Sequence, residues 1–416
     1  MQSVPANAFV TQAAIDAELS EERGGDSNII PPSNSQRVTG SEDTAVISCG
    51  VQWGPEFGKL VALLELRKQE AQQKGIPSAV AVGSYLFSVS SSGFSAGGYV
   101  AYKLSANDVR FGISTTQTPT GDTANVYITM GSSVLMYNNG IEPVWWYCKE
   151  VIAALGGELT WHKISRIDMC VDLWDVPVAD LYEEYRQGHV TRARYKAMYQ
   201  WGNDISGFVL GKGDITLRAY DKRLETEKNP TKWDIIMRRR CPEDWDGRDC
   251  TRVEYQARRE FLKSLGVNTI EDWIAFRASV IEYLTKDWCR VCTAFKDRTH
   301  TTRYELSPLW EKVREQFVLW MGTGQAAKRT FADIQYNGEG LVRMAIGCLG
   351  RVVASRAEGE MYSLDEFLTR CRQVLADSLF SRDIEGIQER CILGYAASNP
   401  YIGPPLETTW DFVLDE

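Results

Sequence analysis

The chain has 416 residues, of which 44% are hydrophobic and 24% are charged, and these proportions exclude a largely disordered chain and a fibrous protein. No stretch reaches the roughly 18 uninterrupted apolar residues of a membrane span, and the start, Met1-Gln-Ser-Val-Pro-Ala, lacks the order of a secretory signal. We therefore expect a cytoplasmic protein without a membrane partner. Ten cysteines without regular spacing indicate reduced thiols.

The charge is distributed unevenly along the chain. The net charge of -9 by itself argues against a nucleic-acid partner. Residues 186–263, however, contain 18 Lys and Arg against 12 Asp and Glu, so a basic middle segment is set in an acidic chain. This asymmetry is the first sign of a DNA-binding surface.

The predicted elements suggest three regions. Residues 1–44 are polar and rich in turns, which predicts a flexible N-terminal arm. Short β-like runs around a helix at 57–73, a helix at 142–155 and strands at 163–173, 215–222 and 251–258 predict a second region, 45–265. In 266–416 the patterns Thr269-Ile-Glu-Asp and Ser363-Leu-Asp-Glu are typical of helix starts, so this C-terminal region is predicted to be mainly helical.

Three of these strands share a chemical pattern. Because successive side chains of a strand point to opposite faces, residues two apart lie on one side. Each strand then has an apolar face and a polar face. Tyr255 lies on the apolar face of the third strand. The polar faces carry Arg166, Asp168, Cys170 and Asp172 in the first strand, Thr216, Arg218, Tyr220 and Lys222 in the second, and Arg252, Glu254, Gln256 and Arg258 in the third. We therefore predict an α+β fold with a central antiparallel or mixed β-sheet, a catalytic face, and helices packed on the other side.

The carboxylates on this face suit a hard divalent cation, Mg²⁺ or Mn²⁺. Asp168 and Asp172 are four residues apart, about 13 Å along a regular strand, so both cannot hold one ion unless a bulge intervenes. One of them together with Glu254 from a neighbouring strand is the better pair. An ordinary amphipathic sheet with no bound ion is the alternative.

Tyr220 is the candidate nucleophile. A tyrosine with an ordinary pKa near 10 is almost fully protonated at neutral pH, so the phenol requires activation. The cations Arg218 and Lys222, two residues to either side, favour the phenolate and are predicted to steer a phosphate. Attack by Tyr220 on a phosphodiester gives a phosphotyrosyl enzyme, whereas attack by metal-bound water hydrolyses the strand.

At these residues the sequence resembles the rolling-circle replication initiation factors of plasmids, filamentous phages and integrative elements, the Rep_trans type. Ser165-Arg-Ile-Asp-Met-Cys-Val-Asp is similar to an R-x-D-x-x-x-D strand, Leu217-Arg-Ala-Tyr-Asp-Lys to an R-x-Y-[DN]-K strand, and Thr251-Arg-Val-Glu-Tyr-Gln to an R-x-E strand. The blocks Phe208-Val-Leu-Gly-Lys-Gly and Tyr127-Ile-Thr-Met-Gly-Ser-Ser are similar to a glycine turn and to an earlier short strand.

The resemblance implies a nickase that cuts one strand of origin DNA, single-stranded or cruciform, and is joined to its 5′ end through Tyr220. It implies metal ligands among Asp168, Asp172 and Glu254, a nicking domain at 45–265, and host helicase and polymerase partners. Assembly as a homodimer stays open. Five further cations are predicted to bind DNA: Arg166, Lys212, Arg223, Arg252 and Arg258.

Several alternatives accompany this interpretation. A relaxase of an integrative element would use the same chemistry, a nuclease would use water, and a DNA-binding regulator would use none. Tyr195 and Tyr199 have the spacing of paired tyrosines in another initiator class, but its His-hydrophobic-His metal strand is absent from the sequence, so a helix-packing or surface role is predicted. Cys289-Arg-Val-Cys292 has the spacing of metal ligands, but we interpret it as a helical segment with ordinary thiols. Gly211-Lys-Gly-Asp is predicted to be a turn.

Overall fold

The computed structural model describes residues 39–95, 99–227, 230–245, 247–293, 304–325, 346, 348–350, 352–353 and 363–379. Contacts divide the chain into two units, Met1–Thr330 and Phe331–Glu416. Residues 1–38, most of the predicted arm, lie outside the described residues. The functional division at residue 265 stays a prediction. No helix among the described residues is long and apolar enough to cross a membrane.

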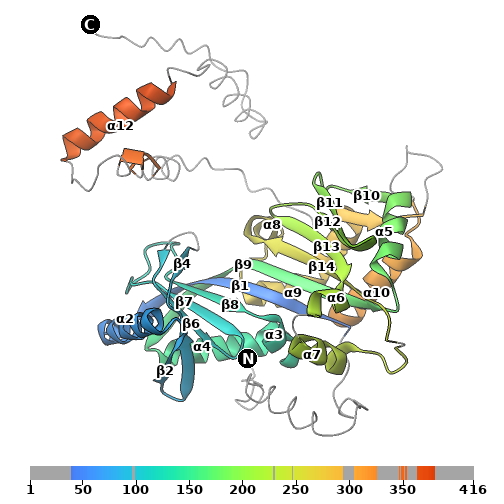
Figure 1. The fold of residues 1–416 in the computed structure, drawn as a ribbon, viewed down its shortest axis with the longest axis horizontal. Coiled ribbons are helices and arrows are strands. Elements are labelled where there is room, and N and C mark those ends of the chain that lie inside the picture. The colour runs from blue at the N-terminus through green and yellow to red at the C-terminus, as the bar shows by residue number, and fades with distance from the viewer. Residues whose placement is uncertain are drawn as a thin grey trace. The chain divides into compact units, whose positions relative to one another are not determined.

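One antiparallel sheet of eleven strands organises the first unit, and this confirms the predicted α+β class (Figure 1). Its strand order is β11-β12-β13-β14-β9-β1-β8-β7-β6-β3-β2. The two long central strands, β1 (Gly40–Trp53) and β9 (Gly157–Trp174), pair along almost their full lengths. The other strands are β2 (Ser78–Val82), β3 (Tyr85–Val89), β6 (Tyr102–Ala106), β7 (Val109–Ile113), β8 (Val126–Met130), β11 (Lys196–Trp201), β12 (Asp204–Leu210), β13 (Ile215–Asp221) and β14 (Cys250–Arg258).

The apolar face of the strands β13, β14, β9 and β1 packs against helices, as the alternation of side chains predicts. Ile167, Met169 and Val171 of β9 are fully buried in the main core. Tyr255 of β14 is also buried, and its hydroxyl donates to the carbonyl of Leu284 at 3.2 Å. The helices of this core include α4 (Ile141–Ala154), α5 (Val178–Gln187), α8 (Arg259–Ser264), α9 (Ile270–Glu282) and α10 (Pro308–Met321). Farther along the sheet, α2 (Phe57–Lys74) packs on β2, β3 and β6.

The polar face is also partly covered at one end. There α3 (Ser132–Tyr137) lies beside β1, and α6 (Lys222–Thr226) and α7 (Pro230–Arg240) follow β13 (Figure 1). Tyr137, Ile235 and Ile236 form a small second core with Trp174, whose side chain is on the polar side of β9. These three helices therefore form a wall at one end of the polar face.

Two predicted helix starts are confirmed by their caps. The hydroxyl of Thr269 accepts from the backbone N–H of Asp272, whose carboxylate accepts from the backbone of Thr269 in return, so a capping box opens α9. In the second unit, α12 (Leu364–Leu379) begins after Ser363, whose backbone N–H donates to Glu366 Oε2 at 2.8 Å. Both signals were visible in the sequence because capping uses local side chains.

Three local assignments differ from the predictions. β1 begins at Gly40, so residues 40–44 belong to the sheet rather than to the arm, because they pair with β9. Tyr199 lies in the edge strand β11 and not in a helix, and its 53% exposure fits the surface role, the other half of its prediction. Cys289 opens a short strand, β15 (Cys289–Val291), which pairs with β10 (His189–Thr191), and it is a buried free thiol, as is Cys292. The turn at Gly211 is confirmed: this glycine has a φ of 81°.

Candidate active site

The register of three neighbouring strands aligns the polar side chains that the sequence singled out. Arg218 of β13 lies directly opposite Glu254 of β14, and Tyr220 lies opposite Arg252. Across the next pairing, Arg252 lies opposite Asp172 of β9. Residues directly opposite each other in an antiparallel pair project from the same face of the sheet. The three polar faces therefore merge into one surface, as predicted.

The Tyr220 side chain lies on this surface, and its hydroxyl donates a hydrogen bond to Glu254. The distance from the Tyr220 hydroxyl to Glu254 Oε2 is 2.9 Å. Burial raises the pKa of Tyr220 well above its usual value of 10, and the neighbouring negative charge of Glu254 raises it further, while Arg252 opposes both effects. The phenol is therefore protonated at neutral pH, and Glu254 is the group placed to remove its proton.

Arg218 contacts the same carboxylate and is itself partly exposed to solvent. Its guanidinium donates to Glu254 Oε1 at 2.8 Å and to Gln256 Oε1 at 2.9 Å. About a third of the Arg218 side chain remains exposed. A planar guanidinium with further free N–H groups can bind two oxygens of a phosphate. Arg218 can therefore bind a phosphodiester close to the Tyr220 hydroxyl.

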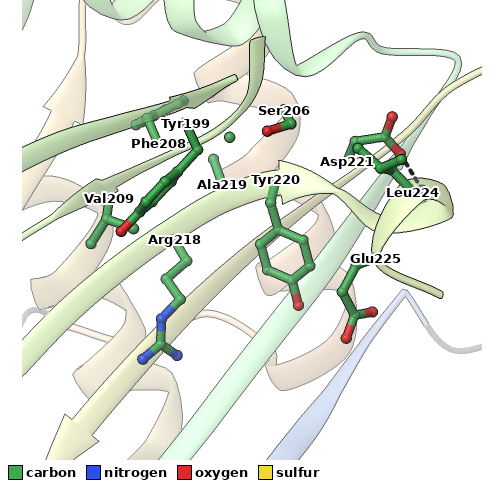
Figure 2. Close-up of a pocket in the computed structure, with 11 residues that line it drawn as sticks. Tyr199, Ser206, Phe208, Val209, Arg218, Ala219, Tyr220, Asp221, Leu224 and Glu225 are labelled. Carbon is green, nitrogen blue, oxygen red and sulfur yellow. Dashed lines mark hydrogen bonds between the residues drawn. The ribbon is translucent and has the colours of Figure 1, made fainter. Parts of the chain in front are cut away.

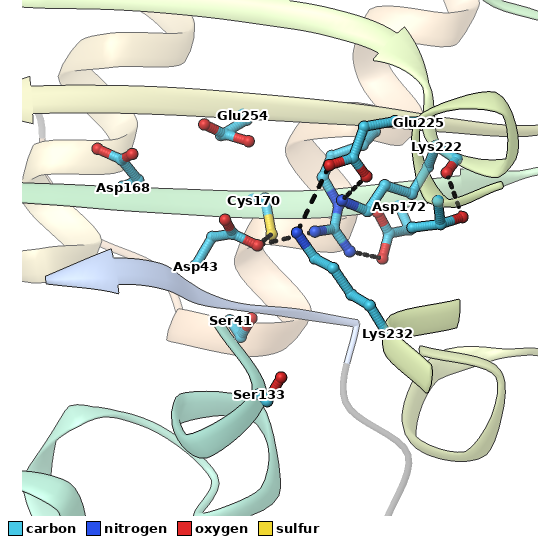
Figure 3. Close-up of polar contacts among 12 residues, drawn as sticks. Ser41, Asp43, Ser133, Asp168, Cys170, Asp172, Lys222, Glu225, Lys232 and Glu254 are labelled. Carbon is cyan, nitrogen blue, oxygen red and sulfur yellow. Dashed lines mark hydrogen bonds and ion pairs between the residues drawn. The ribbon is translucent and has the colours of Figure 1, made fainter. Parts of the chain in front are cut away.

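Asp168 lies on the same face and is almost fully buried. Burial is the main cause that raises the pKa of Asp168 to about 6, and the negative charges of Glu254 and Asp43 raise it further. The Arg166 guanidinium acts in the opposite direction, with Nε donating to Asp168 Oδ1 at 2.8 Å. Figure 3 shows the carboxyl groups of Asp43, Asp168 and Glu254 around the side chain of Cys170. This is a cluster of carboxylates with unfavourable mutual repulsion.

Asp172, a predicted candidate metal ligand, lies in a buried ion-pair network with two arginines. It accepts from Arg252 Nε at 2.6 Å and from Arg240 Nη1 at 2.6 Å, and all three side chains are buried. Burial alone would raise the pKa of Asp172, but the two guanidinium groups outweigh it and hold the pKa well below its usual range. Because its oxygens are engaged by two arginines, Asp172 is a structural ion-pair partner.

Asp43 is a residue of this site that sequence reasoning missed. The register of β1 on β9 shifts between Glu42 and Thr44, so β1 contains one extra residue, a β-bulge. Asp43 Oδ1 accepts from Arg252 Nη1 at 2.8 Å on the polar face, while Glu42 accepts from Trp273 Nε1 at 2.9 Å on the helix side. The acid pair Glu42-Asp43 before a β-like run was the available signal.

Lys222 also differs from its predicted role as a cation that steers phosphate. β13 ends at Asp221, whose side chain caps α6 by accepting from the backbone N–H of Leu224 at 3.0 Å. Lys222 is fully buried, with its ammonium 2.7 Å from Glu225 Oε2 and 5.4 Å from the centre of the Tyr220 ring. Burial lowers the pKa of Lys222 to about 8. Its buried ammonium is engaged inside the wall of helices and does not reach open solvent.

The five cations predicted to bind DNA have unequal access to solvent. Arg252 is fully buried and holds Asp172 and Asp43, so its burial contradicts a DNA contact. The exposed Arg223 donates to backbone carbonyls of Gly247 and Arg248, and thus fixes the loop before β14. About a third of the Arg166 side chain is exposed beside the carboxylates.

Lys212 and Arg258 remain exposed at the other end of the same strands. Arg258 lies opposite Arg166 across the β14–β9 pairing. Lys212 lines a pocket of about 310 Å³ together with Arg192 and Arg194. Its three cations outnumber the one acid of the lining, Asp214, so a phosphate backbone would be attracted near the Gly211 turn.

The structure shows no ready-made metal site: among the described residues, no group of three His, Cys, Asp or Glu side chains is arranged to hold an ion. The donor chemistry nevertheless fits one. Asp43, Asp168 and Glu254 are oxygen ligands of the kind that Mg²⁺ and Mn²⁺ prefer, and their mutual repulsion would be relieved by a divalent cation. To bind it, these carboxylates would exchange arginine contacts for metal contacts.

The chain matches no family model and no curated protein. Among solved structures it is similar to the rolling circle replication initiator protein from Geobacillus stearothermophilus. The two sequences are 11% identical, the TM-score is 0.41, and the match covers 70% of this chain and 99% of the other.

Proposed function

We propose that this protein nicks and rejoins one strand of origin DNA through a covalent bond to Tyr220, and so initiates rolling-circle replication. One observation carries the proposal: the Tyr220 hydroxyl donates to Glu254 on a face that also presents Arg218. A nucleophile and a cation for the phosphate therefore each contact the base that can take the proton, which is the arrangement that covalent phosphoryl transfer requires.

The reaction transfers a phosphodiester from DNA to the protein. As the Tyr220 oxygen bonds to phosphorus, its proton passes to Glu254, and the bond from phosphorus to the 3′ oxygen of the preceding nucleotide breaks. The 3′ oxygen takes a proton from water and becomes the free hydroxyl from which a polymerase can extend. Arg218 binds the non-bridging oxygens, where negative charge increases during transfer. The reverse attack by a 3′ hydroxyl rejoins the strand.

Asp43, Asp168 and Glu254 are the residues we assign to a divalent cation, in place of the predicted set that included Asp172. Mg²⁺ or Mn²⁺, when bound, supplies positive charge that stabilises the transferring phosphate. Arg166 supports this assignment because it already provides a positive charge at Asp168 and can turn toward solvent.

The test is attachment of DNA to the protein. The full chain is incubated with labelled single-stranded oligonucleotides that tile the DNA upstream of its gene, with Mg²⁺ or Mn²⁺, and analysed on denaturing gels and by peptide mass. We expect a covalent adduct on the peptide that contains Tyr220. Tyr220→Phe should form none, whereas Tyr195→Phe, at an exposed tyrosine of the same sheet edge, should react normally.

Two outcomes would contradict the proposal. Cleavage without an adduct would favour a nuclease that uses water, and an adduct on another tyrosine would remove Tyr220 from its role.

The resemblance further suggests host helicase and polymerase partners, a nicking domain at 45–265 and a C-terminal role in origin recognition. These remain part of the proposal, whereas relaxase activity in an integrative element is the alternative with the same chemistry, and assembly as a homodimer stays open.

A further inference from the structure

A hollow of about 360 Å³ lies beside Tyr220 on the polar face, between that residue and the edge of the sheet. The strand register explains it. Tyr199 of β11 lies opposite Gly207 of β12, and Gly207 lies opposite Tyr220 of β13, so the three residues form one row across the sheet. Figure 2 shows Tyr199 and Tyr220 as part of the lining, with Arg218 between them and Glu225 at the far side.

Gly207 is the reason that the row is open in the middle. A Cβ atom at this position would lie 2.9 Å from the carbonyl oxygen of Ala219 and 3.0 Å from the Cβ of Tyr220. Because these neighbours belong to the backbone or to its first side-chain atom, they cannot move aside cheaply. The position thus requires glycine, and its missing side chain leaves a space with an aromatic residue on either side.

The chemistry of the hollow fits a flat aromatic group attached to a phosphate. Tyr199 is 53% exposed on the edge strand β11, so one face of its ring is accessible to a ligand. The lining is mostly apolar, and Arg218 supplies its positive charge; the two acids of the lining, Asp221 and Glu225, are engaged by the backbone of Leu224 and by Lys222. Exposed aromatics next to cations are how proteins bind single-stranded nucleic acid, with bases stacked on the rings and phosphates on the cations.

We infer that this hollow holds one unstacked base of the DNA strand, next to the phosphate that Tyr220 attacks, and that Tyr199 is the surface on which the base stacks. This inference rests on the proposed function. It assigns Tyr199 a positioning role: the captured base fixes the strand on the edge of the sheet, so that the adjoining phosphate lies between Arg218 and the Tyr220 hydroxyl. A volume of about 360 Å³ lies in the range of pockets that bind small organic groups, which suits one base.

The experiment measures binding and not cleavage. Fluorescence anisotropy of a fluorescein-labelled dT12 is recorded with the full chain in EDTA, beside a 12-mer of the same backbone that is abasic throughout. Stacking on one ring is worth about 1–3 kcal/mol per base, so Tyr199→Ala should raise the Kd for dT12 by about 5- to 150-fold. For the abasic strand the same variant should bind within about twofold of the unmodified chain, because the phosphate contacts are unchanged.

Two further variants keep the result specific. Tyr199→Trp retains an aromatic surface and should bind dT12 within about twofold of the unmodified chain. Phe276→Ala removes an equally exposed aromatic from helix α9, which packs on the other face of the sheet, and should have no effect. Thermal unfolding of each variant checks that the fold is retained.

The inference is overturned if Tyr199→Ala binds dT12 as the unmodified chain does, if it weakens the abasic strand equally, or if the unmodified chain binds neither strand. The proposed function can fail separately. A Tyr220 adduct that forms while Tyr199→Ala binds normally would remove only the stacking role. Base-dependent binding through Tyr199 without any adduct would instead leave a DNA-binding site and remove the nickase.

Discussion

The hydroxyl of Tyr220 and the carboxylate of Glu254 are 2.9 Å apart, on neighbouring strands and on one face of the sheet. The alternation of side chains along β13 and β14 produces this contact without any loop or insertion. Because burial and Glu254 together keep the phenol protonated, its reactivity depends on transfer of the proton to Glu254. This dependence gives the first of four predictions.

Glu254→Gln should slow formation of the Tyr220–DNA adduct by about 10²- to 10⁴-fold, the range over which a positioned general base contributes. The glutamine keeps the size and a hydrogen bond to Tyr220 but accepts no proton. The effect is measured as the single-turnover rate on an oligonucleotide that the unmodified chain cleaves. Glu183→Gln is the control for the loss of a carboxylate, because Glu183 is exposed on helix α5 and pairs with Arg186. An unchanged rate in Glu254→Gln would exclude Glu254 as the base.

Mn²⁺ should stabilise the unmodified chain against thermal unfolding. A ligand at 100 times its Kd contributes about 2.7 kcal/mol to the folded state. Asp43→Asn, Asp168→Asn and Glu254→Gln should each remove most of this gain, since each replaces a carboxylate of the cluster. Titration calorimetry with Mn²⁺ alone gives the same comparison without heating. If Asp43→Asn binds Mn²⁺ with unchanged affinity, Asp43 is not a ligand.

Asp172→Ala should reduce the free energy of unfolding by about 3–5 kcal/mol, because it leaves the buried guanidinium groups of Arg252 and Arg240 without this carboxylate. Asp168→Ala should cost less than about 1 kcal/mol, since its partner Arg166 is a third exposed and can be solvated. Urea unfolding of the two variants makes the comparison. Equal losses would contradict the division between a structural and a site carboxylate.

Lys222→Met should stabilise the protein at pH 7 and lose that advantage at high pH. Burial lowers the pKa of Lys222 from 10.5 to about 8, so the folded state carries a buried charge below pH 8 that the unfolded state keeps in water. The cost is complete below pH 8 and disappears as pH rises from 8 to 10.5, and it amounts to about 3 kcal/mol at most. Unfolding free energies at pH 7 and pH 10 measure the difference between the two chains. A difference that is the same at both pH values would contradict this assignment.

Much of the site was predictable from the sequence because strands impose a period of two. Arg218, Tyr220 and Glu254 were placed on one face by counting alone, and the register confirms their proximity. Thr269 and Ser363 were identified as helix caps for a similar reason, since capping depends on residues three positions apart. Local periodicity was therefore sufficient wherever the functional side chains lie within one regular element.

The remaining features depend on contacts between distant segments. Arg240 ends the run Arg238-Arg-Arg240, whose composition alone predicts a solvated face, yet its side chain reaches from α7 to the buried Asp172. The alternation predicted a strand that includes Lys222. In the structure β13 ends at Asp221, which caps α6, so Lys222 is the first residue of a helix and does not lie on the predicted face. Asp43 was hidden in a polar stretch, since pairing with β9, which lies more than a hundred residues later in the chain, is what makes that stretch a strand.

The bulge in β1 makes two adjacent acids serve opposite sides of the sheet. Glu42 anchors helix α9 through Trp273, while Asp43 belongs to the reactive face. Loss of one residue between Gly40 and Thr44 would remove the bulge and turn Glu42 and Asp43 to the faces opposite those they now serve, away from Trp273 and Arg252. This short stretch should therefore tolerate no change in its number of residues.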